Sequence, residues 1–338
     1  MQLGTNEKVY DRKMDEFAGR KIFTMRKTLI LYESRYGSTK EAAKILALIL
    51  GPARACRVDE FEESYKDIDL LVIGTPIYSE QIDPKIVQFI EENSSWLKDK
   101  SIVLFCLSLD RANGDAVLQK LLRDQQLKVI SSKAFGGKLD LEKLNDEDYR
   151  ILLVFQDKMG LPMQNIDNFS RDKIIEFALE IKQATERSAK TMPSVELGPW
   201  AEDFLKKHNT CTLATALGNR VRATPIEYNY HSGLLYLLSE GGEKFANILL
   251  NNRVSIAVYD EYRSMDKLAG MQITGQAFIV DPGDQEYKDF LHLKGYNPDK
   301  IATMPFVLNM IRIEMEKVEI LNSDFKKMGQ EVKQILLF

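Results

Sequence analysis

The feature that most constrains the fold of this chain is an alternation of short apolar runs and amphipathic segments along its first half. The runs Thr28–Tyr32, 69–74 and Ser101–Ser108 show no polar alternation, which is typical of strands covered on both faces. A further strand is expected at 129–139, and helices are expected at 38–50, Pro84–Glu92, 114–123 and 170–184. Strands that alternate with helices predict a parallel, doubly wound α/β sheet.

The turn after the first strand has the composition of an anion-binding loop. Gly37 lets the backbone approach a ligand closely, and hydroxyl groups are available from Ser34, Ser38 and Thr39. The start of the following helix adds free N–H groups and a positive dipole end, which suit a phosphate. A plain turn with a serine cap is the alternative that these residues leave open. The turn has neither GK[ST] nor GxGxxG, which counts against a Walker loop and against NAD.

The length of 338 residues exceeds what one hydrophobic core usually serves, so two domains are expected. Proline, glycine and small polar residues gather at 188–198, which predicts a linker. The predicted organisation is an extension at 1–24 without an assigned role, a first domain at 25–187, the linker at 188–198, and a second domain at 199–338.

The composition excludes several classes of function. The net charge of −4, with both signs interspersed, offers no broad basic surface for nucleic acid. Three cysteines and three histidines lie far apart without CxxC, so neither a disulfide framework nor a metal site is predicted. No apolar run reaches the ~18 residues of a membrane span, and the N-terminus has no apolar signal core. A cytoplasmic location follows by elimination.

The second half of the chain changes to strands joined by turns. Strands are expected at 210–215, 222–230, 234–238, 254–259, 271–280 and 310–321, and helices at 200–207 and 243–251. A hairpin turn is expected at His231, Ser232 and Gly233. Many strands with few helices predict a small β-barrel.

A second anion site is indicated by charge placement in this half. Arg222 alternates with Thr224 on one strand, and Lys244 follows the glycine turn 239–242 at a helix start. A cation beside a glycine turn at a helix start describes an anion site. A solvated lysine is the alternative on the residues alone.

Several motifs of the first half resemble those of flavodoxins. The SRYGST turn at 34–39 resembles their phosphate loop, GTPIYS at 74–79 followed by Pro84 resembles their second flavin loop, and SLD at 108–110 resembles their third. The FGGKLD segment at 135–140, with the long insertion before the last helix, is similar to the menaquinone-dependent protoporphyrinogen oxidase family. The resemblance covers about 25–185.

This resemblance implies an FMN site built from three loops. The phosphate would be held by Ser34, Gly37, Ser38 and Thr39. The ring would be flanked by Thr75, Pro76, Ile77 and Tyr78, with Ser108 and Asp110 in the third loop. Tyr78 is expected to stack on the ring. The second loop departs from many flavodoxins because it contains no tryptophan.

Motifs of the second half resemble the pyridoxamine 5′-phosphate oxidase-like split-barrel superfamily. The motifs are RATP at 222–225, LYLLSEGGEK at 235–244, NNRVS at 251–255 and GQA at 275–277, and they cover about 199–321. The resemblance implies FMN contacts from Arg222, Thr224, Ser239 and Lys244. Some relatives carry a deazaflavin coenzyme or haem instead, or have no activity, so a deazaflavin or haem is an alternative to FMN at this second site. The substrate-binding pattern of true pyridoxamine phosphate oxidases is not evident, so vitamin B6 chemistry is not predicted.

Together these patterns predict an FMN-dependent oxidoreductase or electron-transfer flavoprotein with two flavin sites per chain. Catalytic residues are not assigned, and the partner is an unidentified redox protein or small molecule. One alternative is protoporphyrinogen oxidase-like activity in the first domain. Another is a non-catalytic protein that binds flavin or haem or senses redox state. A homodimer through the second domain is expected, since split-barrel relatives usually place flavin at a two-fold interface.

Overall fold

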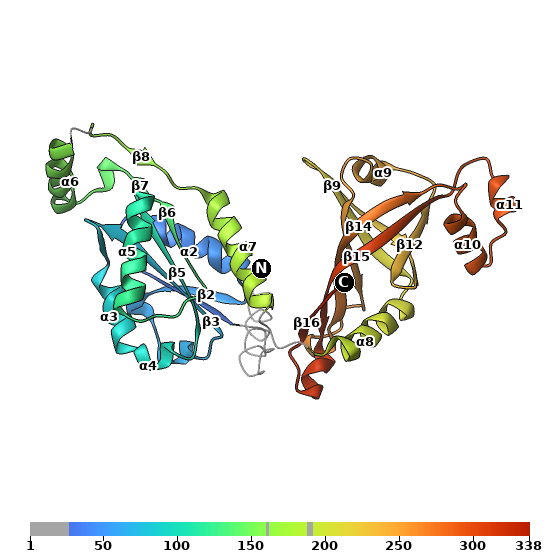
Figure 1. Ribbon diagram of the computed structural model, residues 1–338, viewed down its shortest axis with the longest axis horizontal. Coiled ribbons are helices and arrows are strands. Elements are labelled where there is room, and N and C mark those ends of the chain that lie inside the picture. Colours follow the sequence, from blue (N-terminus) through green and yellow to red (C-terminus); the bar gives the residue numbers. More distant parts are fainter. Residues whose placement is uncertain (1–26, 160–161, 188–191) are drawn as a thin grey trace, which may run out of the picture. The chain divides into compact units, whose positions relative to one another are not determined.

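The computed structural model of the protein describes residues 27–159, 162–187 and 192–338. They fall into two compact units, one within Thr24–Ala189 and one within Lys190–Phe338 (Figure 1). The predicted extension at 1–24 and the first part of the predicted linker lie outside the described residues. The boundaries predicted from sequence stay predictions, and each unit is described by itself.

The N-terminal unit is built on a parallel sheet with the strand order β2-β1-β3-β5-β6. Its strands are β1 (Thr28–Tyr32), β2 (Ala53–Arg57), β3 (Leu70–Tyr78), β5 (Ser101–Ser108) and β6 (Ser131–Gly136). The short strand β4 (Gln81–Ile82) pairs with the end of β3. The doubly wound α/β fold predicted from sequence is confirmed.

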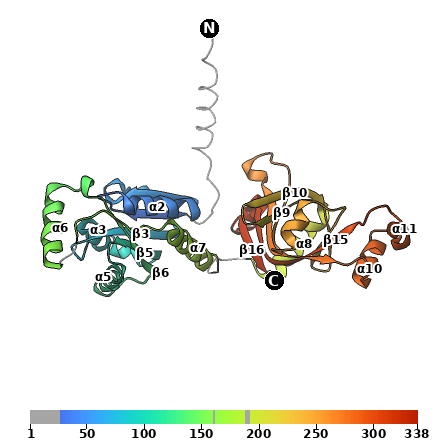
Figure 2. The same ribbon diagram turned by 90° about the horizontal axis from the view of Figure 1, so that it is seen from above.

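Helices cover both faces of this sheet, which explains the unbroken apolar strands. On one face, Ile30 packs in a core with residues of α2 (Ser38–Ile49) and α7 (Arg171–Arg187). On the other face, Leu31 packs with residues of α3 (Pro84–Glu92), α4 (Ser94–Leu97) and α5 (Arg111–Asp124). Figure 2 shows α2 and α5 on opposite sides of the sheet. Successive side chains of a strand point to opposite faces, so both must be apolar.

An insertion follows β6 at the carboxyl ends of the strands. The predicted strand 129–139 is divided into β6 and β7 (Lys138–Leu139), and β7 pairs with β8 (Ile166–Asp167). The backbone of Asn168 passes so close to Gly136 that a Cβ there would overlap its carbonyl oxygen. Between β7 and β8 lies α6 (Asp146–Met159), which stands away from the sheet in Figure 1.

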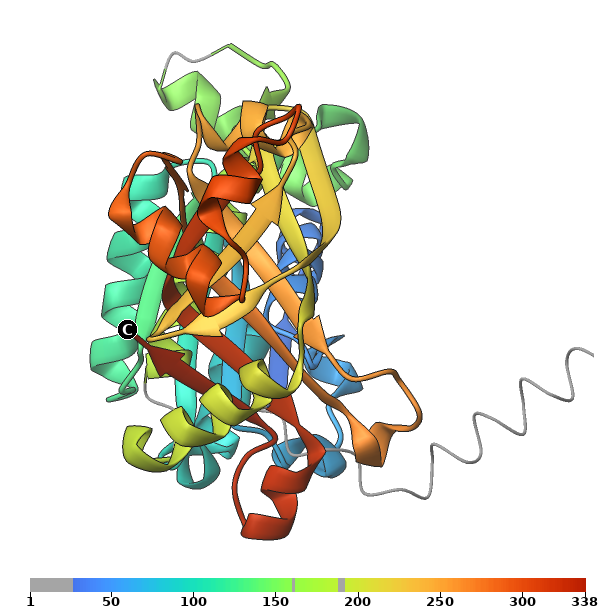
Figure 3. The ribbon, with the colours of Figure 1, turned by 90° about the vertical axis from the view of Figure 1, so that its right-hand side faces the viewer.

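The C-terminal unit is an antiparallel sheet of eight strands in the order β10-β9-β13-β14-β15-β12-β11, with β16 beside β15. Its strands are β9 (Thr210–Leu217), β10 (Arg220–Glu227), β11 (Asn229–His231), β12 (Leu234–Ser239), β13 (Arg253–Tyr259), β14 (Ala269–Val280), β15 (Asn309–Asn322) and β16 (Lys333–Leu337). The sheet curls around its core (Figure 3), as a split barrel does. The barrel predicted from sequence is confirmed in this form.

The helices of the C-terminal unit differ in length from those predicted. Helix α8 (Ser194–Lys207) begins six residues before the predicted start at 200, and its buried Leu197 explains the extra turn. Helix α9 (Glu243–Ile248) ends three residues earlier than predicted. Two further helices, α10 (Gln285–Leu293) and α11 (Pro298–Ala302), lie between β14 and β15. The hairpin turn at Ser232 and Gly233 has positive φ at both residues, as a type I′ turn requires.

Candidate functional site

A pocket of about 460 Å³ lies at the carboxyl edge of the N-terminal sheet. In parallel α/β folds this edge is where ligands bind. The lining includes seven of the residues predicted from sequence: Ser38, Thr39, Pro76, Ile77, Tyr78, Ser108 and Asp110. The structure thus brings together three loops that are distant in sequence.

One end of the pocket is polar and is formed by the start of α2. Gly37 has φ 98°, and no side chain of the described residues caps the helix. The first helical bond runs from Glu41 N to Gly37 O at 2.9 Å. The N–H groups of the first turn therefore have no intrahelical partner and suit an anion. Ser34 supports the turn, because its hydroxyl accepts from Gly37 N at 3.1 Å.

The second loop brings Tyr78 to the pocket beside two residues of the first loop. The Arg35 guanidinium carbon lies 4.8 Å from the ring centroid of Tyr78, and the Tyr36 ring meets it edge-on with centroids 6.0 Å apart. Burial raises the pKa of Tyr78 to about 12, so its hydroxyl is neutral near pH 7. With Arg35 over one ring face, a flavin could stack only on the other face or after Arg35 moves.

Thr75 and Asp110 hold the loops in shape. The buried hydroxyl of Thr75 donates to Pro76 O at 3.0 Å and accepts from Asp83 N at 3.3 Å, so its role is within the loop. The carboxylate of Asp110 caps α5 by accepting from Ala112 N at 2.9 Å and from Asn113 N at 3.3 Å. Asp110 thus lines the pocket as the first residue before a helix.

Two of the predicted residues of the second half, Ser239 and Lys244, lie around Gly241 after the end of β12. Lys244 is 7 % exposed, and its Nζ donates to Gly241 O at 2.5 Å. The hydroxyl of Ser239 accepts from Gly241 N at 3.3 Å. Burial lowers the pKa of Lys244, the charge of Glu240 opposes this, and the charge of Arg222 adds to it. A desolvated ammonium beside a second cation favours an anionic partner.

Arg222 completes this cation pair, but it is engaged within the chain. Its Nη1 lies 3.1 Å from Glu243 Oε2. Thr224 lies half-buried two residues along β10. Because α9 has only six residues, its dipole adds little to the positive charge of the two side chains. The contacts within the chain use one of the three N–H donors of Lys244 and one of the five of Arg222, so both cations keep donors for an anion.

Each of the two units matches the model of a different protein family. Residues 29–157 match the family model described as a flavodoxin domain, and residues 197–322 match the model described as pyridoxamine 5′-phosphate oxidase. The chain joins a flavodoxin domain to a pyridoxamine 5′-phosphate oxidase-like domain. Both resemblances stated from the motifs are confirmed, and both domain types support a flavin-binding protein of redox type. The comparison with protoporphyrinogen oxidases stays a prediction.

Solved structures that are similar to this chain match part of it. A putative pyridoxamine 5′-phosphate oxidase from Listeria innocua is 21 % identical, with 38 % of this chain and 99 % of that one covered and a TM-score of 0.31. The conserved hypothetical protein Rv2991 from Mycobacterium tuberculosis is 22 % identical over 42 % and 91 %, with a TM-score of 0.33. The heme storage protein HutZ from Vibrio cholerae is 16 % identical over 35 % and 89 %, with a TM-score of 0.30. No curated protein matches the chain.

The flavodoxin domain also contains pocket residues that the motifs did not indicate. Asp148, Ile151 and Leu152 of α6 form part of the lining, as do Lys138 and Leu144 before it. The available signal was the long insertion itself, since a loop of this length in a compact domain is often functional. Within the described residues, no three His, Cys, Asp or Glu side chains are placed to hold a metal, and no helix could span a membrane.

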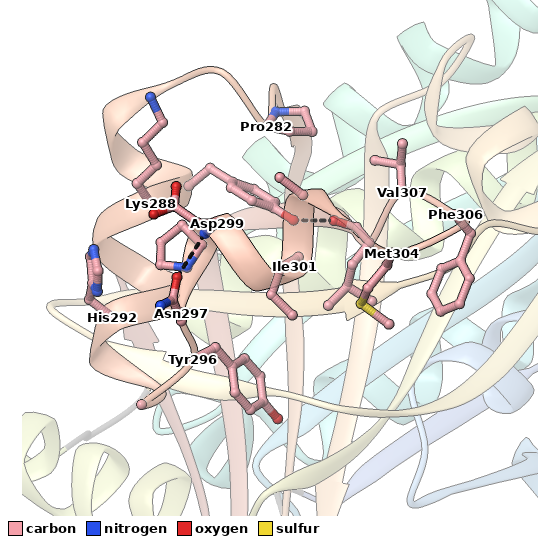
Figure 4. A pocket seen from close by; sticks show the side chains of 15 residues that line it. Pro282, Lys288, His292, Tyr296, Asn297, Asp299, Ile301, Met304, Phe306 and Val307 are labelled. Carbon is pink, nitrogen blue, oxygen red and sulfur yellow. Dashed lines mark hydrogen bonds between the residues drawn. The ribbon is translucent and has the colours of Figure 1, made fainter.

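In the oxidase-like domain, two pockets larger than that of the flavodoxin domain lie away from Lys244. One of about 740 Å³ is formed by α10, α11 and the segment after them (Figure 4). Within it, Tyr287 donates to Leu308 O at 2.7 Å. Another of about 800 Å³ lies between α8 and the segments around Asp260 and Ser323. Neither is lined by Arg222, Thr224, Ser239 or Lys244.

Proposed function

We propose that this protein is an FMN-dependent oxidoreductase that holds one FMN in each domain and exchanges electrons with a partner protein or small molecule. The observation that carries the proposal is the pocket of about 460 Å³, which joins an uncapped helix start to an apolar and aromatic end in a flavodoxin domain. Bound FMN would supply the redox chemistry, and the chain would supply position and exclusion of water.

In the flavodoxin domain, the phosphate would lie at the start of α2. Ser38, Thr39 and the amides of the first turn would bind it, with Gly37 allowing the close approach. Ile77 and Tyr78 would pack against the ring. The flavodoxin motifs of the sequence imply the same residues.

In the oxidase-like domain, Lys244 and Arg222 would hold the phosphate of a second FMN. Full positive charges make hydrogen bonds about twice as strong as neutral groups do. The buried position of Lys244 fits this role, because burial lowers the pKa of its ammonium more than the charge of Glu240 raises it, and a phosphate would stabilise the charged form. Ser239 would complete the site beside Lys244, and Thr224 would do so beside Arg222.

We propose that two copies of the oxidase-like domain form a homodimer that covers this second site. Strand β10 is an edge strand, and Val221 on it is 74 % exposed. Leu249 and Leu250, which follow α9, are 71 % and 74 % exposed. Exposed apolar side chains around a binding site are typical of an interface, and two-fold dimers are the commonest assembly.

The identity of the cofactor tests the proposal directly. The protein is purified, passed through gel filtration and denatured, and the released cofactor is identified by its spectrum and mass. FMN supports the proposal, whereas a haem Soret band or a deazaflavin in its place contradicts it. Bleaching by NADH or NADPH would separate a reductase from a storage or sensing protein. Oxidation of protoporphyrinogen with a quinone acceptor would identify the alternative activity, and the cytoplasmic location stays a prediction.

A further inference from the structure

Two side chains of the phosphate loop bind a residue far along the chain. Arg35 Nη1 lies 2.7 Å from both carboxylate oxygens of Asp148, at the start of α6. The hydroxyl of Tyr36 donates to the same carboxylate. Arg35 and Tyr36 are thus directed toward the inserted helix, while their neighbours Ser38 and Thr39 line the polar end of the pocket.

Asp148 is well satisfied and mostly buried at this point. Its side chain is 17 % exposed, and Asn145 Nδ2 donates to it at 3.2 Å. Burial opposes ionisation of Asp148, but the hydrogen bonds from Arg35 and Tyr36 outweigh it and hold the pKa of this carboxyl below its ordinary value. A charged, partly buried contact of this kind is stronger than an exposed ion pair.

The same contact connects α6 to the second flavin loop and to the pocket. Arg35 lies over the ring of Tyr78 and Tyr36 meets its edge. Ile151 and Leu152, one turn after Asp148, line the pocket. Among the described side chains of α6, Asp148 is the one whose hydrogen bonds and ion pair reach the phosphate loop, through Arg35 and Tyr36. Asn145, just before the helix, also donates to Asp148.

We propose that Asp148 is a positioning residue that fixes α6 as a wall of the flavin pocket and couples this wall to the phosphate loop. When the Arg35–Asp148 pair is broken, α6 keeps only the contact of Tyr36 with Asp148, and both the helix and the loop lose part of their support. Bound FMN would then leave faster, and the pocket would open on the side of Ile151 and Leu152. The inference rests on the proposed FMN site of the flavodoxin domain.

The first test measures FMN release from the full-length protein. Asp148→Asn keeps the size of the side chain and removes the charge that Arg35 pairs with. Asp157→Asn removes a charge from an exposed position of the same helix and is the matched control. A Lys244→Ala background confines the signal to the flavodoxin domain. We expect release to be roughly ten- to a hundred-fold faster in Asp148→Asn, which is the scale of a hydrogen bond to a charged group. Equal rates in the two variants would overturn the proposal.

A double-mutant cycle separates this coupling from a general effect on packing. Arg35→Gln and Asp148→Asn are combined, and FMN release is measured for each single variant and for the pair. If the two residues act through one contact, the double variant releases FMN about as fast as either single variant. Multiplied effects in the double variant would show independent roles and would contradict the proposal.

Hydrogen exchange of the FMN-free protein tests the attachment without any ligand. Amides of α6 should exchange faster in Asp148→Asn than in wild type and in Asp157→Asn, while amides of β5 stay unchanged. Unchanged exchange rates of the α6 amides would refute the attachment even if FMN binds.

If wild type binds no FMN in this domain, the proposed function fails, but the exchange result still decides the role of Asp148. Should Asp148→Asn expose β5, the milder Tyr36→Phe replaces it, with the same direction expected.

Discussion

Gly37 has the backbone conformation on which the turn into α2 depends. Its φ is 98°, where side chains other than glycine are strained, although no described atom lies within 4 Å of a Cβ built there. A substitution therefore acts through backbone strain of about 1–2 kcal/mol rather than through a clash with the protein. We expect Gly37→Ala to weaken FMN binding in the flavodoxin domain, measured by titration of the FMN-free protein.

The control for Gly37 is a glycine with ordinary φ. Gly198 lies within α8 and also has open space at its Cβ. Gly198→Ala should leave FMN binding unchanged and stabilise α8 by about 0.5–1 kcal/mol, because alanine loses less conformational entropy there. Equal FMN affinity in Gly37→Ala and wild type would show that the loop does not hold the phosphate.

Lys244 predicts a pH dependence of the second site. Burial lowers the pKa of its ammonium, so the FMN-free protein loses this charge at a lower pH than an exposed lysine would. Phosphate binds the charged form, and affinity should therefore fall as the pH rises through that lowered pKa. Lys244→Arg keeps a charge across this range and should show a flatter profile. Identical profiles, measured by titration with FMN, would contradict the role of Lys244.

At the scale of elements, the end of β6 meets the residue that follows β8 at a position where only glycine fits. A Cβ at Gly136 would overlap the backbone of Asn168, whereas one at Gly137 would lie 3.7 Å from its nearest neighbour. Gly136→Ala should therefore destabilise the flavodoxin domain by about 1–3 kcal/mol. Gly137→Ala should change it by much less. Denaturant unfolding, followed by a spectroscopic signal of each domain, measures both variants. Equal free energies of unfolding for Gly136→Ala and Gly137→Ala would contradict the close packing at Gly136.

The bounds of buried elements follow from the sequence, while those of partly exposed elements do not. The bounds of β1, α3 and β5 match the predicted ones. An apolar run marks both limits of each strand, and Pro84 marks the start of α3. Strand β2 was missed because its sequence ARACR is charged and half-exposed at the sheet edge. Helix α6 was missed although its first turn is acidic, as helix starts often are, because exposed apolar side chains such as Ile151, Leu153 and Val154 leave no clear apolar face.

The candidate site was predictable where it lies in local loops. Ser38, Thr39, Tyr78 and Asp110, which the motifs indicated, line one pocket because each lies at or just after the carboxyl end of a strand, and their role in binding stays a prediction. They did not indicate Asp148, which meets Arg35 across 113 residues of sequence. The Arg222–Glu243 pair was also missed, because two exposed charges on separate elements leave no pattern in the sequence.

At the scale of the whole molecule, the proposed homodimer gives a direct prediction. Val221→Glu places a charge on the exposed edge strand and should turn the dimer into a monomer, because a buried unpaired charge is costly at an interface. Val195→Glu makes the same change on α8, where Val195 is 81 % exposed, and should leave the dimer intact. Light scattering at micromolar concentration measures the mass. A monomeric wild type, or a dimeric Val221→Glu, would contradict this assembly.

The number of FMN molecules per chain tests the two-site account most directly. Wild type, Gly37→Ala, Lys244→Ala and the double variant are loaded with FMN, passed through gel filtration and analysed for FMN and protein. Lys244→Ala removes a charge-assisted contact of about 1.5–3 kcal/mol. We predict two FMN per chain in wild type, one in each single variant and none in the double variant. A wild type that never exceeds one FMN, or a Lys244→Ala variant that still holds two, would contradict the account.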